Sequence, residues 1–273
     1  MGWLIRYEAF PQFFDPTLQG YREMSRTLPA LRDSWMKILS NGEHVGYVNS
    51  SIEMTEVEGE EQLQMRTQIL IRVYYQGRFE LVRLTNEVLL DSRQDLTGSL
   101  STFSAGTYTG SLHLEPIEGS KDFTMTAQLN QMKFKRQISL PPGVVISSPL
   151  MDTGLRSVTV GKTVYIRTMD PFSPTGELRT VEVTGISVES RTLPGEERPL
   201  DVTLVSIKMG DWDLEAEIDE FGRIVRQETP FGMTFVQSDA STAMKIPKDN
   251  ALDPVQLLST SSYPSFMKLP ENL

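Results

Sequence analysis

Apolar and polar residues alternate with a period of two along most of the chain from Trp35 onward. The clearest run is Phe123, Met125, Ala127 and Leu129, which are separated by threonine, glutamine and asparagine positions. This alternation is typical of strands with one buried face. The strands that it predicts cover residues 65–75, 79–88, 123–130, 203–209, 214–218 and 224–229. Such closely spaced strands predict a mainly β protein with one large curled antiparallel sheet, half-barrel or sandwich-like in shape.

The first 32 residues follow a different pattern. Leu18, Tyr21, Met24 and Leu28 recur at spacings of three or four before Pro29, which predicts a helix within residues 16–32. The resulting organisation is an N-terminal segment with a helix at 1–32, an antiparallel β domain at 33–238 and a C-terminal tail at 239–273. We expect apolar residues of the tail to dock on the body. These residues are Leu257, Leu258, Phe266 and Met267.

The composition excludes several classes of function. The chain has 36 acidic and 26 basic residues, a formal net charge of -10, which argues against a nucleic-acid-binding surface. It has no cysteine, so disulfides, thiolate metal sites, iron–sulfur clusters and a cysteine nucleophile are excluded. With only two histidines, three-histidine metal sites are excluded as well. We therefore expect no cofactor.

Neither a membrane span nor a signal peptide is evident. No stretch approaches the roughly 20 apolar residues that a spanning helix needs. The first residues lack both the basic head and the continuous apolar run of a signal peptide. Membrane association is expected only through an anchor that this chain does not contain.

The densest polar pattern is a row of carboxylates spaced two residues apart: Asp211, Asp213, Glu215, Glu217 and Asp219. In a strand these side chains would share one face, where Asp211, Asp213 and Glu215 form a candidate cation site. The same row could supply paired carboxylates to a hydrolase acting on glycans or peptides. The other interpretation is a solvated outer face with cross-strand partners such as Arg223 or Arg226.

Other motifs have ordinary structural interpretations. Gly161-Lys162-Thr163 resembles the end of a phosphate-binding loop, but Arg156 stands where that motif needs a glycine and a strand is expected to follow. These residues are interpreted as a turn that enters a strand. His44 is expected to be exposed in a turn, and His113 to point away from the face of its apolar neighbours.

Three stretches occur in an order that resembles a known family. They are Asp33–Ile38 with Gly42 and Val45–Tyr47; Val160–Val164 with Asp170–Ser173; and Asp219–Glu228 with Pro230–Met233. This order resembles the β-rich domain that precedes transglutaminase-like domains in bacterial envelope proteins. It is similar, more loosely, to the curled sheets of lipoprotein carriers. The resemblance covers residues 33–238.

The resemblance implies an extracytoplasmic module of the cell envelope, found behind an anchor and ahead of a catalytic domain. We expect this chain to carry neither, and without cysteine it cannot supply the nucleophile of transglutaminase chemistry. We therefore expect no enzymatic activity, but a binding or scaffolding module that engages a protein partner or an apolar ligand. Contact would be made through the concave sheet face or an exposed strand edge. The alternatives are the hydrolase and a purely structural subunit.

Overall fold

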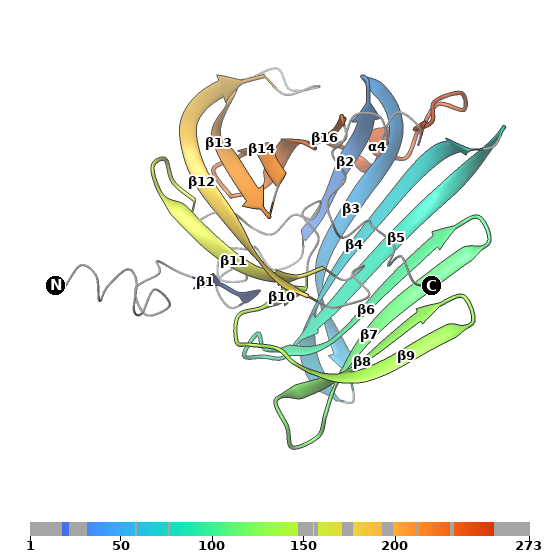
Figure 1. Ribbon diagram of the computed structural model, residues 1–273. Coiled ribbons are helices and arrows are strands. Elements are labelled where there is room, and N and C mark those ends of the chain that lie inside the picture. The colour runs from blue at the N-terminus through green and yellow to red at the C-terminus, as the bar shows by residue number, and fades with distance from the viewer. Residues whose placement is uncertain are drawn as a thin grey trace.

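Two runs of antiparallel strands make up the structure, a computed structural model of the chain (Figure 1). The structure describes residues 18–21, 32–57, 59–75, 77–146, 155, 158–170, 177–192, 199–210, 212–229 and 232–253. The first run consists of β2 (Arg32–Ser40), β3 (Glu43–Val57), β4 (Glu60–Tyr75), β5 (Arg78–Leu90), β6 (Leu96–Ala105), β7 (Tyr108–Pro116), β8 (Asp122–Leu129) and β9 (Met132–Ser139). The second consists of β11 (Thr163–Met169), β12 (Leu178–Arg191), β13 (Leu200–Met209), β14 (Trp212–Ile218), β15 (Ile224–Glu228) and β16 (Met233–Ser238).

Antiparallel pairing between β16 and β2 joins the two runs, so that the described strands form one sheet. The sheet order is β1-β11-β12-β13-β14-β15-β16-β2-β3-β4-β5-β6-β7-β8-β9. The short strands β1 (Leu18–Gln19) and β10 (Val145–Ile146) both pair with β11 in parallel. Strand β9 ends the sheet on one side. The predicted mainly β, curled antiparallel sheet is therefore confirmed.

Short turns connect neighbouring strands because the sequence supplies residues that tolerate positive φ. At the β2–β3 turn, Asn41 has φ 50° and Gly42 has φ 83°. An Asn-Gly pair with positive φ at both residues matches the right-handed twist of the flanking strands. The turn between β14 and β15 likewise contains a residue with positive φ, Gly222 at 76°.

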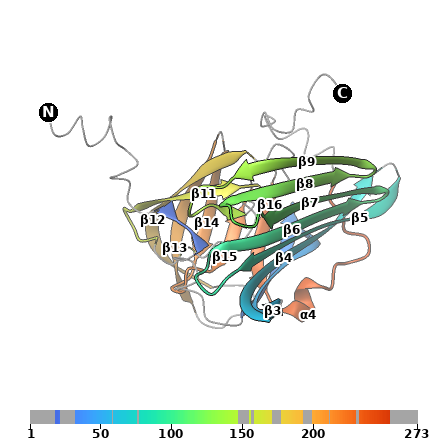
Figure 2. The same ribbon diagram turned by 90° about the horizontal axis from the view of Figure 1, so that it is seen from below.

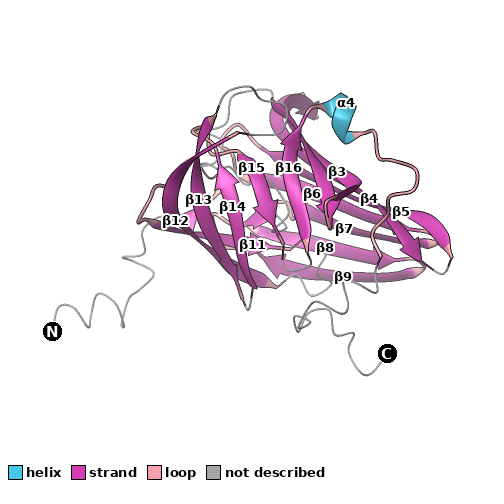
Figure 3. Cartoon of the chain, turned by 90° about the horizontal axis from the view of Figure 1, so that it is seen from above, coloured by secondary structure: helices cyan, strands magenta, loops and turns pink. Residues whose placement is uncertain are grey.

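The core lies on the inner face, between the two halves of the curled sheet (Figures 1 and 3). Its fully buried side chains come from both runs, as expected for alternating strands with one apolar face. They include Ile38, Ile69, Leu90 and Leu114 from the first run and Ile166, Met169, Ile218 and Phe235 from the second. Val144, Val145, Ile146, Leu155 and Val158 add further buried groups to the same cluster.

The N-terminal helix predicted for residues 16–32 begins differently in the structure. Leu18 and Gln19 form β1, which pairs with Tyr165 and Ile166 of β11. Pairing with an exposed strand edge satisfies the main chain here, and it overrides the helical spacing of the side chains. Tyr21 is helical, as predicted, and residues 16–17 and 22–31 of the segment lie outside the described residues.

The C-terminal region returns to the sheet at Leu252. The pairing between β3 and β4 ends at Gly46 and Ile71, beyond which β4 continues without β3 beside it. Leu252 takes that place: its N–H donates to the Arg72 oxygen, and its oxygen accepts from the Tyr74 N–H, both at 2.8 Å. The short helix α4 (Ala240–Ala243) precedes it and lies beside β3 in Figure 2, with Asp239 as the N-cap. The four tail residues predicted to dock lie outside the described residues.

Gly46 allows the close approach of β3 to β4. A Cβ atom at this position would lie 2.2 Å from the Leu70 oxygen and 3.0 Å from the Ile71 Cα, both main-chain atoms that cannot rotate away. Gly98 is a matched control, because a Cβ there would meet only the Leu114 oxygen, at 3.4 Å.

Replacing Gly46 with alanine should therefore destabilise the fold by about 1–3 kcal/mol, since the two strands must separate. Gly98→Ala should change the free energy of unfolding by less than about 1 kcal/mol. Urea unfolding followed by circular dichroism measures both. Equal effects of the two substitutions would contradict the close approach of β3 and β4.

Candidate functional site

The carboxylate row of 211–219 does not form a common site. Asp211 lies outside the described residues. Asp213 and Glu215 are exposed on β14, opposite the buried face of that strand. Asp219 lies beyond the end of β14, in the turn to β15, where its Oδ1 accepts hydrogen bonds from the Phe221 and Arg223 N–H groups at 2.9 Å. The prediction that all five carboxylates share one strand face is thus wrong for Asp219, because the strand ends one residue earlier.

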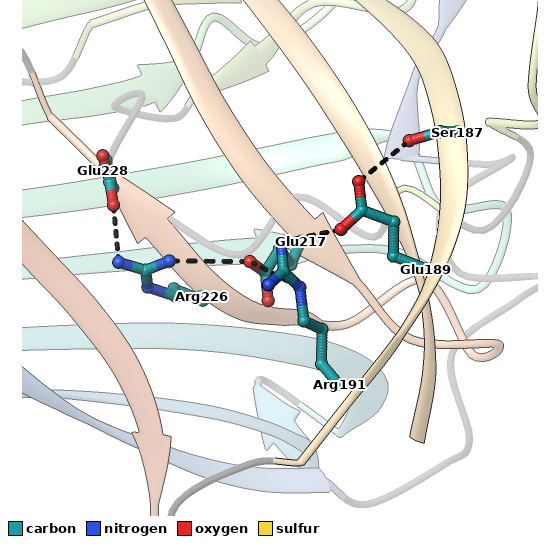
Figure 4. A network of polar contacts seen from close by, with 6 residues as sticks. All are labelled: Ser187, Glu189, Arg191, Glu217, Arg226 and Glu228. Atoms are coloured by element: carbon teal, nitrogen blue, oxygen red, sulfur yellow. Dashed lines mark hydrogen bonds and ion pairs between the residues drawn. The ribbon is translucent and has the colours of Figure 1, made fainter. Parts of the chain in front are cut away.

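Glu217 is the centre of a charged network between β12, β14 and β15 (Figure 4). Glu217 is only 6% exposed to solvent. Its Oε1 lies 3.6 Å from Arg226 Nη1 and 3.9 Å from Arg191 Nε. Arg226 also contacts Glu228 at 2.5 Å, and Arg191 contacts Glu189 at 2.7 Å. The charge of this buried carboxylate is therefore compensated by ion pairs with two guanidinium groups.

Of the predicted partners, only Arg226 pairs across strands, and the predicted solvated outer face holds for Asp213 and Glu215 but not for Glu217 and Asp219, which are buried. Arg226 pairs with Glu217 across the β14–β15 ladder, and Arg223 pairs with Asp219 within the turn. In the part of the chain that the structure describes, no group of three or more histidine and acidic side chains is placed to hold a metal ion. The candidate cation site keeps only Asp213 and Glu215 among described residues, both exposed to solvent.

The two histidines belong to strands that β4, β5 and β6 separate in the sheet. His44 is half-buried rather than exposed as predicted, because β3 begins at Glu43. Burial is the main cause that lowers its pKa below the usual value, opposed by a hydrogen bond to the Gly46 oxygen at 2.9 Å. His113 points away from the buried Leu112 and Leu114, as predicted, and its Nδ1 lies 3.6 Å from Glu115.

The stretch Gly161-Lys162-Thr163 is a turn that leads into β11, as predicted. Gly161 has φ 77°, and its N–H donates to the Gly185 oxygen at 2.9 Å. Because a strand follows, the geometry of a helix N-terminus that binds phosphate is missing here.

Among the described residues, no helix is long and apolar enough to cross a membrane.

A buried polar cluster that the sequence pattern did not predict links β10 to the inner face of the first run by hydrogen bonds. The Tyr21 hydroxyl accepts from the Ile146 N–H at 2.7 Å. Asn86 Nδ2 donates to the Ile146 oxygen at 3.2 Å, and its Oδ1 accepts from Ser101 Oγ at 2.7 Å. Burial raises the pKa of the Tyr21 phenol well above its usual range, so the hydroxyl stays neutral. These bonds satisfy polar groups in the core and position β10.

An exposed apolar surface lies at the other end of the inner face. We call it the apolar corner, and it comprises Phe103, Tyr108, Leu129, Met132 and Phe134. By strand register these residues lie on the same side of the sheet as the buried Leu112 and Ile71. Phe103 and Leu129 approach each other over Gly110, which has no side chain of its own to fill that space.

The apolar corner stays open although it continues the core face. Tyr108 is 62%, Leu129 44%, Met132 50% and Phe134 61% exposed. Leu129 and Met132 line an open hollow at the hairpin tips, together with Thr107, Thr109, Asn130 and Gln131. Contiguous exposed apolar groups on one surface are typical of interaction sites. The alternation along 123–129 predicted the face of Leu129 but not its exposure, since period-two patterns do not show where a covering layer ends.

Two solved structures resemble this chain at low structural similarity. No protein-family model matches the chain, and no curated protein matches it in sequence. A beta-barrel-like protein of the domain of unknown function DUF1849 from Brucella abortus is 7% identical, with a TM-score of 0.48, over 77% of this chain and 96% of that one. A DUF1089 family protein from Pseudomonas aeruginosa is 16% identical, with a TM-score of 0.34, over 68% and 90%. No function is taken from either likeness.

The Tyr21 hydroxyl can be tested by substitution. Tyr21→Phe keeps the ring but leaves the buried Ile146 N–H without its acceptor, which should destabilise the fold by about 1–3 kcal/mol. The same change at the exposed Tyr108 should have an effect below about 0.5 kcal/mol. Thermal and urea unfolding of both variants would check this. An unchanged Tyr21→Phe variant would show that the cluster does not hold β10.

Glu217 can be compared with its exposed neighbour Glu215 on the same strand. Glu217→Gln removes the negative charge that Arg191 and Arg226 share, so we expect the free energy of unfolding to fall by about 1–3 kcal/mol. The fall stays in this range because both cations are partly solvated. Glu215→Gln should stay within about 0.5 kcal/mol of the unchanged protein. Urea denaturation at neutral pH distinguishes them, and a larger effect at Glu215 would contradict the central place of Glu217.

Proposed function

We propose that this protein is a non-catalytic binding module of the bacterial cell envelope that engages a protein partner through the apolar corner. The observation that carries the proposal is the contrast along the inner face. The same alternating positions that are buried at Leu112, Leu114 and Met125 become exposed at Leu129, Met132 and Phe134. Leaving such groups in water forgoes roughly 25 cal/mol for each Å² of apolar surface that a partner could cover.

A protein partner is favoured over an enclosed apolar ligand. The inner face between the two halves is occupied by side chains of the protein itself, including Ile146, Leu155 and Val158. The apolar corner, in contrast, is broad and open at the hairpin tips. An open surface with aromatic and methionine side chains suits a protein contact, because such residues are enriched in protein interfaces.

The non-catalytic part of the proposal is supported by the state of the carboxylates. A hydrolase acting through residues 211–219 needs two carboxyl groups that face a common substrate. Glu217 is instead bound by Arg191 and Arg226, and Asp219 caps its own turn. The envelope location is supported by the resemblance of residues 33–238 to the domain that precedes transglutaminase-like domains.

A photo-crosslinking amino acid placed at Phe134 tests the proposal. We expect discrete covalent adducts when the full chain carrying it is illuminated in an envelope extract of its own bacterium, because the side chain would lie within the interface. Phe79 is the matched control: it is 51% exposed, but lies on the outer face beside Tyr74.

Gel electrophoresis and mass spectrometry of the adducts provide the measurement. Adducts from position 134 and none from position 79 are the expected result. Equal labelling from both positions, or none from either, would contradict a binding role for the apolar corner.

A further inference from the structure

Strand β9 ends the sheet and leaves one edge unpaired among the described residues. It pairs with β8 over its whole length, from Asp122–Ser139 to Leu129–Met132, and it is the last strand in the sheet order. In an antiparallel pair, alternate residues direct their N–H and C=O groups away from the partner. Alternate residues of this eight-residue strand thus offer a regular row of main-chain donors and acceptors to an additional strand.

The two faces of β9 differ in chemistry. Met132 and Phe134 belong to the apolar corner on the inner side, whereas Lys133 and Lys135 point to the outer side. Both lysines are exposed, and their direct neighbours on β8 are the neutral Gln128 and Thr126. Neither lysine forms an ion pair with a described residue.

Some basic side chains elsewhere in the sheet do have a carboxylate opposite them. Arg66 on β4 lies 3.2 Å from Glu87 on the neighbouring β5, and Arg226 on β15 lies 3.6 Å from Glu217 on β14. The whole chain carries a formal net charge of -10. Strand β9 is therefore a basic edge on an acidic protein, and its electrostatic field favours a negatively charged partner.

We infer that β9 binds an extended acidic peptide segment of a partner protein as an added strand. The inference rests on the proposed function and names the class of partner. The bound segment would alternate acidic and apolar residues. Its carboxylates would lie opposite Lys133 and Lys135, and its apolar side chains would extend the apolar corner beside Phe134. Main-chain hydrogen bonds would give affinity, and this alternation would give specificity.

The same charges argue against the other occupants of the edge. A second copy would bring its own lysines opposite Lys133 and Lys135, and like charges directly opposite each other destabilise a ladder. An anionic lipid surface would satisfy the lysines but not the row of main-chain groups along β9, since lipids present no strand to pair with. A peptide satisfies both.

Synthetic peptides of about eight residues, matched to β9, test the inference with the full chain. One alternates glutamate and valine, a second alternates lysine and valine, and a third is the glutamate peptide with N-methyl groups on alternate residues. Fluorescence anisotropy should show that the glutamate peptide binds about tenfold or more tightly than the lysine peptide at low salt. N-methylation should weaken binding at least about tenfold, because it removes ladder donors.

Charge reversal provides the matched control. In the double variant Lys133→Glu, Lys135→Glu, the order of the two peptides should be inverted, so that the lysine peptide binds more tightly. Both positions are exposed, so unchanged circular dichroism and thermal unfolding would show that the fold is retained. Raising the salt should reduce the preference in both proteins.

Several outcomes would overturn the inference. These are equal binding of the three peptides, loss of affinity without inversion in the double variant, a dimer joined through β9, and binding to phosphatidylglycerol vesicles without peptide binding. If the crosslinker at position 134 captures a partner but the glutamate peptide binds no more tightly than the lysine peptide, the proposed function stands and only this inference fails. If the order of the two peptides is inverted in the double variant but position 134 gives no adduct, strand addition at β9 stands and the proposed function fails.

Discussion

The ladder between β16 and β2 determines the shape of the whole molecule. It brings together strands from opposite ends of the described chain, with Phe235 beside Ile38 and Val236 beside Lys37. Because residues paired across strands share a face, one buried row continues from Ala216 through Gln227, Phe235 and Ile38. Without this ladder, each run of strands would expose an apolar face that the other run helps to cover. Both the enclosed core and the exposed corner follow from this single junction.

The two ends of the inner face differ because the described residues cover only one of them. Ile146, Leu155 and Val158 fill the region between the halves, and Tyr21 fixes Ile146 through its hydroxyl. The strands β7, β8 and β9 extend beyond this filling, which leaves Leu129 and Phe134 in water. This uncovered continuation of a core face is the physical basis of the binding role that we propose, and the basic β9 edge lies beside it.

Period-two alternation predicted the segments that form β4, β5, β8, β13, β14 and β15, because apolar side chains on one face of a strand recur at every second position. It could not predict which strands meet across the chain, because the register of Phe235 with Ile38 depends on residues about 200 positions apart. It also missed β1, where pairing with β11 overrides the helical spacing around Leu18. The apolar corner and the paired state of Glu217 depend on tertiary neighbours, which no local pattern contains.

During synthesis on the ribosome, the first run is complete when Ser139 has emerged, yet β2 then lacks its outer neighbour. That neighbour, Met233–Ser238, is among the last described segments to be made. The unpaired edge of β2 must wait through the synthesis of β10 to β15 with the buried side of Ile38 uncovered. A nascent chain in this state presents both a free strand edge and an apolar face. These two features promote misassembly, and they are the features that chaperones protect.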